Sequence, residues 1–180
     1  MTTASPYTII DSAAQPIERH TLAIKVDNEP GTLARVIGLF SGRGYNIESL
    51  TVSEIDAENH QSRITIVTTG TAMVIEQIKA QLERLVPVHG VRDLTIDGPH
   101  VERELALIKV SGVGEKRVES LRIAELFRAR VLDAALDSFV FEMTGTTDKL
   151  NAFINLMVPL GLVDVSRTGI VAISRGNKSF

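Results

Sequence analysis

The amino-acid sequence predicts an α+β protein made of two tandem ferredoxin-like domains, each with the element order βαββαβ. Two observations lead to this prediction: the order of strand and helix periodicities in residues 19–98, and a second run of that order in residues 99–180. A length of 180 residues with 44% hydrophobic content suits two small globular domains. We therefore predict domains over residues 19–98 and 99–180, preceded by a flexible tail over residues 1–18.

The spacing of apolar residues sets the elements of the first domain. The expected elements are a strand over 21–26, a helix from Pro30 to 42, strands over 45–54 and 62–69, a helix over 75–85 and a strand over 88–96. Pro30 suits the first turn of its helix, and Gly42 and Gly44 are typical of a helix end. A polar turn at 56–60 separates the second strand from the third.

The second domain is expected to repeat this order. Strand-like segments lie at 104–110, 131–136, 139–144 and 163–174, the last interrupted by Gly169, and helix-like segments lie at 115–128 and 150–157. Residues 64–71 resemble residues 139–146, and the apolar positions from Ile75 to Val88 meet apolar residues at the same offset. A match that stays in phase predicts two copies of one small fold.

The composition excludes several functional classes. The formal net charge is −3 and aromatic residues make up 4% of the chain, which argues against a nucleic-acid partner. The absence of cysteine excludes thiolate metal sites and a cysteine nucleophile, and it fits a cytoplasmic protein. No apolar run reaches the length of a membrane span, and no membrane partner is expected.

Catalytic and metal-binding residues are not predicted in this sequence. The four histidines stand singly near segment ends, without the spacing of metal ligands. No serine lies in a nucleophile-elbow pattern, and residues 112–117 resemble a phosphate-binding loop only faintly. The sequence therefore favours a protein that binds a small molecule over one that transforms it.

The loop before the first helix is the strongest candidate for a binding site. Backbone N–H groups at a helix start are free to hold an anion, and here they belong to Gly31, Thr32 and Leu33. Gly31 has no Cβ, so a ligand could approach the backbone closely. Asn28 could cap the helix or bind a ligand amine or carboxylate. On these residues alone, an ordinary capped turn is the slightly favoured interpretation.

Asn46 and Ile47 form a second candidate, at the expected start of the second strand. Asparagine is unfavourable in strands, and the parity of apolar residues changes between Tyr45 and Leu50. A β-bulge could explain both features by re-aiming Asn46 or Ile47. The alternative is an ordinary turn asparagine that follows Gly44.

Two long blocks, residues 27–36 and 42–52, closely resemble the ACT domain of the small regulatory subunit of acetolactate synthase, also called acetohydroxyacid synthase. Residues 100–105 look like the junction between the two domains of that family. Residues 125–128 and 174–176 also fit its C-terminal domain. The resemblance runs from about residue 19 to the end of the chain.

The resemblance implies a non-catalytic subunit without a cofactor of its own. Its expected partner is the large catalytic subunit, which carries thiamine diphosphate, magnesium and FAD. The small subunit of this family activates that partner and confers feedback inhibition by valine, leucine or isoleucine. The family also implies a homodimer through the ACT domain, with the effector between protomers. Asn28 and the amides of residues 31–33 would then come from one chain, and Asn46 with Ile47 from the other.

Two other functions remain open from the sequence. One is an ACT-type sensor of a different amino acid that acts on another enzyme or on transcription. The other is an enzyme or an RNA-binding domain on the same ferredoxin-like fold, because fold does not determine function.

Overall fold

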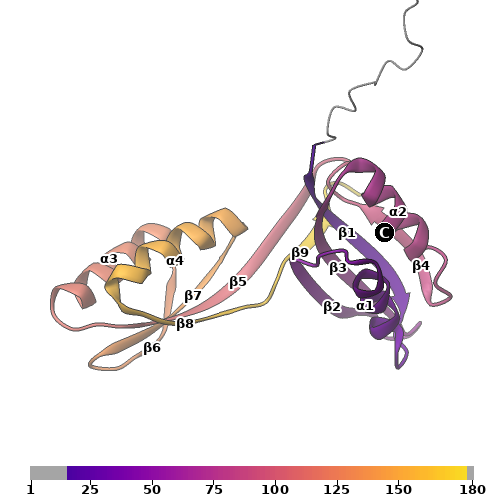
Figure 1. Ribbon diagram of the computed structural model, residues 1–180. Helices are drawn as coiled ribbons and strands as arrows, with labels where there is room; N and C mark the ends of the chain where they lie inside the picture. The colour runs from indigo at the N-terminus through magenta and orange to yellow at the C-terminus, as the bar shows by residue number, and fades with distance from the viewer. Residues whose placement is uncertain (1–15, 178–180) are drawn as a thin grey trace, which may run out of the picture.

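The computed structural model describes residues 16–177, which form two domains joined by a long strand (Figure 1). Each domain is an antiparallel sheet covered by two helices, so the predicted α+β class and the tandem βαββαβ order are confirmed. No helix of the described part has the length and apolar character that a membrane crossing requires. Residues 1–15 of the predicted tail lie outside the described residues.

The first domain has a four-stranded sheet in the order β2-β3-β1-β4. Its elements are β1 (Glu18–Asp27), α1 (Thr32–Arg43), β2 (Ser49–Asp56), β3 (Gln61–Gly70), α2 (Ala72–Leu82) and β4 (Val88–Asp93). Leu22 and Ile24 of β1 and Phe40 of α1 are fully buried in the core between sheet and helices. The strand order places β2 at the edge of the sheet, where its outer backbone groups have no neighbouring strand among residues 16–177.

The second domain has a similar sheet in the order β6-β7-β5-β8. Its elements are β5 (His100–Ser111), α3 (Glu115–Phe127), β6 (Arg130–Ala134), β7 (Ser138–Gly145), α4 (Thr147–Gly161), β8 (Leu162–Arg167) and β9 (Val171–Ser174). The core contains Ile108, Phe141 and Phe153, and the last two rings meet edge to face at 6.0 Å between centroids. This core is separate from that of the first domain.

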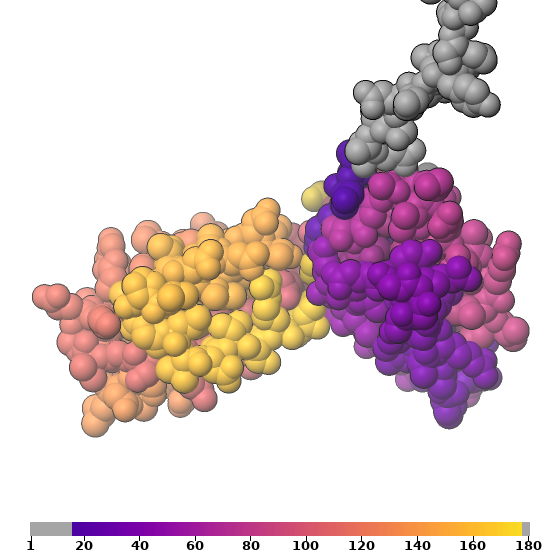
Figure 2. Space-filling view, viewed as in Figure 1, coloured from indigo at the N-terminus to yellow at the C-terminus, as the bar shows by residue number. Residues whose placement is uncertain are grey.

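Strand β5 connects the two domains, because its two halves pair with different partners. Residues 104–111 pair with β7, whereas residues 100–103 pair with β9 in a two-stranded ribbon. The ribbon lies against the first sheet, where Ala172 packs on Ala23 and Leu94. Figure 2 shows the C-terminal part of the chain, in yellow, at the contact between the domains. The interruption expected at Gly169 is present, with φ at 84°, and it separates β8 from β9.

Candidate functional site

The loop after β1 brings a glycine and two free amides to the start of α1. Gly31 occupies the N-cap position at φ 88°, and no side chain caps the helix. The Thr32 N–H donates to the Glu29 carbonyl oxygen at 3.2 Å, while the N–H groups of Gly31 and Leu33 have no hydrogen-bond partner among residues 16–177. Two of the three predicted amides are thus available to an anion, and the positive end of the helix dipole adds to their attraction.

The space beside this helix start is open. A Cβ placed on Gly31 would meet no heavy atom within 4 Å, so packing does not require a glycine there. The backbone conformation does, because a φ of 88° is strained for residues with a Cβ. Thr32 is buried, whereas Leu33 keeps 37% of its surface exposed beside the free amides.

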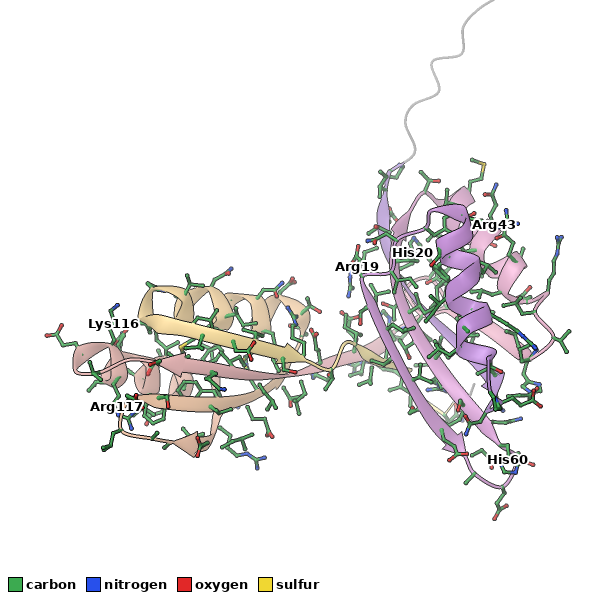
Figure 3. The ribbon with its side chains drawn as sticks, turned by 60° about the horizontal axis from the view of Figure 1, so that its bottom comes forward. Arg19, His20, Arg43, His60, Lys116 and Arg117 are labelled. Atoms are coloured by element: carbon green, nitrogen blue, oxygen red, sulfur yellow. The ribbon has the colours of Figure 1, made fainter. Side chains whose placement is uncertain are left out.

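Asn28 does not cap α1, so the capping interpretation is wrong. Its side-chain Nδ2 donates to Glu54 Oε1 at 3.0 Å, which links the loop to strand β2. Its backbone N–H donates to the carbonyl oxygen of His60 at 2.6 Å, and His60 lies at the tip of the β2–β3 hairpin (Figure 3). The loop is therefore held against the hairpin, with the Asn28 Oδ1 and the Glu54 carboxylate as hydrogen-bond acceptors.

Sequence reasoning missed Glu54. Only the strand register brings Glu54 close to Asn28. Ser62 of β3 lies opposite Glu54 on one side and opposite Val26, two residues before Asn28, on the other. Both partners are exposed, so the pair is accessible to a ligand. Acceptors on Asn28 and Glu54 beside donors at α1 suit a molecule with both an ammonium and a carboxylate group.

The second candidate pair lies before β2, outside any strand and not in a bulge. The Asn46 carbonyl oxygen accepts from Thr68 Oγ1 at 2.6 Å, and the Asn46 side chain is exposed. Ile47 is half-buried and packs against the first core. The register shift of β2 instead lies between Glu54 and Asp56. The parity change arises because Ile47 precedes the strand, so strand alternation does not apply to it.

A single chain does not bring the loop at Asn28 together with Asn46 and Ile47. Gly31 precedes α1 and Asn46 follows it, and a helix of 12 residues separates them by about 18 Å. The loop at Asn28 therefore lacks Asn46 and Ile47 as neighbours within one chain. Among residues 16–177 there is no group of three His, Cys, Asp or Glu residues that could hold a metal ion.

These features define the class of the protein: a tandem ferredoxin-like protein with an ACT domain at its N-terminal end. Residues 22–90 match the family model described as the acetohydroxyacid synthase small subunit-like ACT domain, and residues 103–176 match the small subunit of acetolactate synthase. The chain belongs to the acetolactate synthase small subunit family.

Relatives match along most of their length. The chain is 48% identical to the probable acetolactate synthase small subunit of Archaeoglobus fulgidus, over 89% of this chain and 99% of that protein. It is 45% identical to the isozyme 3 small subunit of Escherichia coli, over 89% of this chain and 98% of that protein. The crystal structure of the acetolactate synthase small subunit of Thermotoga maritima is 38% identical, with a TM-score of 0.80 over 89% of this chain and 99% of that one.

Proposed function

We propose that this chain is the non-catalytic regulatory subunit of an acetolactate synthase. In this role it binds the large catalytic subunit, raises the activity of that subunit and confers feedback inhibition by valine, leucine or isoleucine. Membership of the small subunit family supports the regulatory role. The observation that supports the effector site is the loop from Asn28 to Leu33, which has acceptor atoms at its first residue and two unpaired N–H donors, on Gly31 and Leu33, at the start of α1.

The two sets of groups match the two charges of an α-amino acid. The carboxylate lies on the N–H groups of Gly31 and Leu33, at the positive end of α1. The ammonium group donates to Asn28 Oδ1 and to the carboxylate of Glu54, because Asn28 Nδ2 is already used. In this proposal the amine lies at Asn28, and Glu54 is its counter-charge.

A second copy of the chain completes the site. Strand β2 is an edge strand with Val52 45% exposed, so it can pair with β2 of another protomer. Such pairing brings Asn46 and Ile47 of the partner copy to the loop that lacks them. Leu33 and Ile47 then provide apolar surface for an aliphatic side chain, at about 0.8 kcal/mol per buried methylene group.

Inhibition requires that the effector binds two states of the complex with different affinities. The effector stabilises one arrangement of the paired ACT domains, and the catalytic subunit responds to that arrangement. Strand β5 is a physical connection for this response, because one strand belongs to the ribbon under the first sheet and to the centre of the second. Thiamine diphosphate, magnesium and FAD belong to the catalytic partner in this proposal, and the complex acts in the cytoplasm.

A thermal-shift screen of the twenty amino acids tests the effector. At a concentration about 100-fold above the dissociation constant, a ligand adds about 2.7 kcal/mol to the stability of the state that binds it. We expect a rise in Tm with valine, leucine or isoleucine, and no rise with aspartate or lysine. A response to a different amino acid alone would favour the ACT-type sensor of another pathway. Activity assays of the catalytic subunit with and without this chain test the partner.

A further inference from the structure

A shallow groove of about 460 Å³ lies on the helical layer of the first domain, between α1 and the end of α2. The residues that line it come from both helices and from the turn after α2: Arg35, Leu39, Arg43, Gln81, Arg84 and Leu85. Figure 3 shows Arg43 at the end of α1. The β2 edge and the ribbon are elsewhere on the domain, so pairing through β2 uses the sheet edge and not the groove floor.

Three guanidinium groups of this groove have no ion-pair or hydrogen-bond partner within residues 16–177: those of Arg35, Arg43 and Arg84. Outside the groove, Arg122 is paired with Glu119 and Arg167 with Glu104. The whole chain carries a net charge of −3, so three unpaired cations in one groove are not a result of a basic composition.

Helix stability does not explain this arrangement. A cation near the end of a helix is favourable, and Arg43 occupies such a position. Arg35, however, lies in the first turn of α1, where the helix dipole disfavours a cation and where no acidic residue is present. Its position fits an attraction to an external anion instead.

The residues at the floor of the groove show which further chemical groups a bound molecule should carry. Leu39 and Leu85 are only partly buried, and both pack against the first core. Gln81 Oε1 is buried and has no hydrogen-bond partner in the described structure. An acceptor of this kind is costly to leave unpaired, so the occupant should supply an N–H or O–H donor. A molecule that carries carboxylates, aliphatic groups and a hydrogen-bond donor has the chemistry of an acidic amphipathic peptide.

We propose that this groove is the docking site for an acidic, amphipathic segment of the catalytic subunit. Carboxylates of that segment pair with the three guanidinium groups, where bidentate contacts are available, and its aliphatic side chains lie on Leu39 and Leu85. The inference rests on the proposed function for the identity of the partner. The first fifteen residues of this chain contain a single acidic residue, Asp11, so they match the groove poorly.

Binding of charge variants to the catalytic subunit tests the proposal. The test variant is Arg43→Glu/Arg84→Glu, which leaves Arg35 beside the effector loop unchanged. The matched control is Lys116→Glu/Lys149→Glu, which makes the same change of charge at exposed lysines of the second domain. We expect affinity of the test variant to fall by about tenfold or more, with a weaker dependence on salt, and that of the control to stay within about twofold.

The outcomes separate this inference from the function on which it rests. Wild-type affinity in the test variant, or an equal loss in the control, would overturn the docking site while leaving the proposed function intact. A wild-type chain that does not bind the catalytic subunit would overturn both. The thermal shift with the effector should be unchanged in the test variant, which shows that it is folded and binds ligand.

A cross-link identifies the occupant directly. The sequence contains no cysteine, so Arg84→Cys gives a single attachment point for a cleavable photo-cross-linker. We expect the captured peptide to come from the catalytic subunit and to contain several Asp or Glu residues among aliphatic ones. A peptide from a second copy of this chain, or one without acidic residues, would contradict the proposal. Lys149→Cys serves as the control attachment point.

Discussion

Asn28 Nδ2 donates a hydrogen bond of 3.0 Å to Glu54 Oε1, and this contact joins the loop before α1 to strand β2. Because Nδ2 is used in this contact, Oδ1 is the atom of the Asn28 side chain that remains to accept a hydrogen bond from the proposed ligand. The N–H groups of Gly31 and Leu33, which have no hydrogen-bond partner among residues 16–177, follow Asn28 at the start of α1. In the proposed site, donors and acceptors in this order favour a zwitterion over a simple anion.

The first prediction concerns Glu54. Glu54→Gln keeps the size of the side chain and removes the negative charge that faces the ammonium group. We expect at least about tenfold weaker binding of the effector, since one charge-assisted hydrogen bond is worth about 1.5–3 kcal/mol and about 1.4 kcal/mol is a factor of ten. Activation of the catalytic subunit should remain. Titration calorimetry with valine measures the first effect and an activity assay the second.

Glu58→Gln is the matched control for this change. Glu58 is exposed in the turn of the same hairpin. Its substitution by Gln removes the same charge as Glu54→Gln, but at a residue that makes no hydrogen bond to Asn28. An equal loss of affinity in both variants would show a general effect of charge and would rule out a direct contact between Glu54 and the ligand.

The second prediction concerns Gly31. Gly31→Asp places a carboxylate where the carboxylate of the effector should lie, and it also introduces a Cβ at a φ of 88°. We expect the variant to lose feedback inhibition and the thermal shift with valine, while it still activates the catalytic subunit. Gly38→Asp makes the same change of charge on an exposed position of α1 and should keep both responses. A Gly31→Asp complex that stays fully sensitive to valine would refute the position of the carboxylate.

The sequence predicted local features well because each depends on a few neighbouring residues. Gly44 ends α1 at its C-cap, as predicted. The helix begins at Thr32 after the N-cap Gly31, so Pro30 lies just before the helix and not in its first turn. The predicted start of β2 is wrong, because Asn46 and Ile47 precede the strand and are held by contacts with distant residues: Asn46 by Thr68 and Ile47 by the first core. Glu54 could not be found from its neighbours, since its partner Asn28 is 26 residues away.

The C-terminal strand illustrates the same limit on a larger scale. The periodicity of residues 163–174 indicates strand structure, but it contains no information about which sheet each half joins. β9 pairs with residues 100–103 under the first domain, whereas β8 pairs with the second half of β5. Tertiary packing of Ala172 against Ala23 and Leu94 decides between these partners.

The third prediction concerns the ion pair between Arg167 and Glu104. Arg167 donates to both carboxylate oxygens of Glu104, and the Glu104 side chain is only 6% exposed against 31% for Arg167. Arg167→Ala leaves a buried carboxylate without its partner, and we expect a loss of about 2–3 kcal/mol in the free energy of unfolding. Chemical denaturation measures this loss.

A second arginine provides the comparison. Arg122 also makes two hydrogen bonds to one carboxylate, that of Glu119, but both side chains lie on the surface of α3. Hydrogen bonding to Arg122 lowers the pKa of Glu119, yet solvent screens this pair. Arg122→Ala should leave the denaturation midpoint almost unchanged. Similar denaturation midpoints for Arg167→Ala and Arg122→Ala would show that the burial of Glu104 does not increase the stabilisation that its ion pair provides.

The last prediction concerns Gly169, which lets the ribbon dock on β2. A Cβ at this residue would lie 2.9 Å from Ser49 Oγ and 3.1 Å from Thr51 Cγ2. Those two side chains hold the ribbon: Ile170 N–H donates to Ser49 Oγ at 2.8 Å, and Thr51 Oγ1 donates to the Ile170 carbonyl oxygen at 2.9 Å. Gly169→Ala should therefore displace the ribbon and break both bonds.

Gly176→Ala separates this steric effect from backbone strain. Gly176 has nearly the same φ, 85° against 84° at Gly169, but a Cβ there meets no heavy atom within 4 Å. Each alanine is expected to cost about 1–2 kcal/mol through its positive φ, and only Gly169→Ala should add the cost of the displaced contact. Hydrogen exchange of the Ile170 amide, which depends on its bond to Ser49, should become faster in Gly169→Ala and stay slow in Gly176→Ala. Equal exchange in the two variants would mean that the ribbon is held by its pairing with β5 and not by β2.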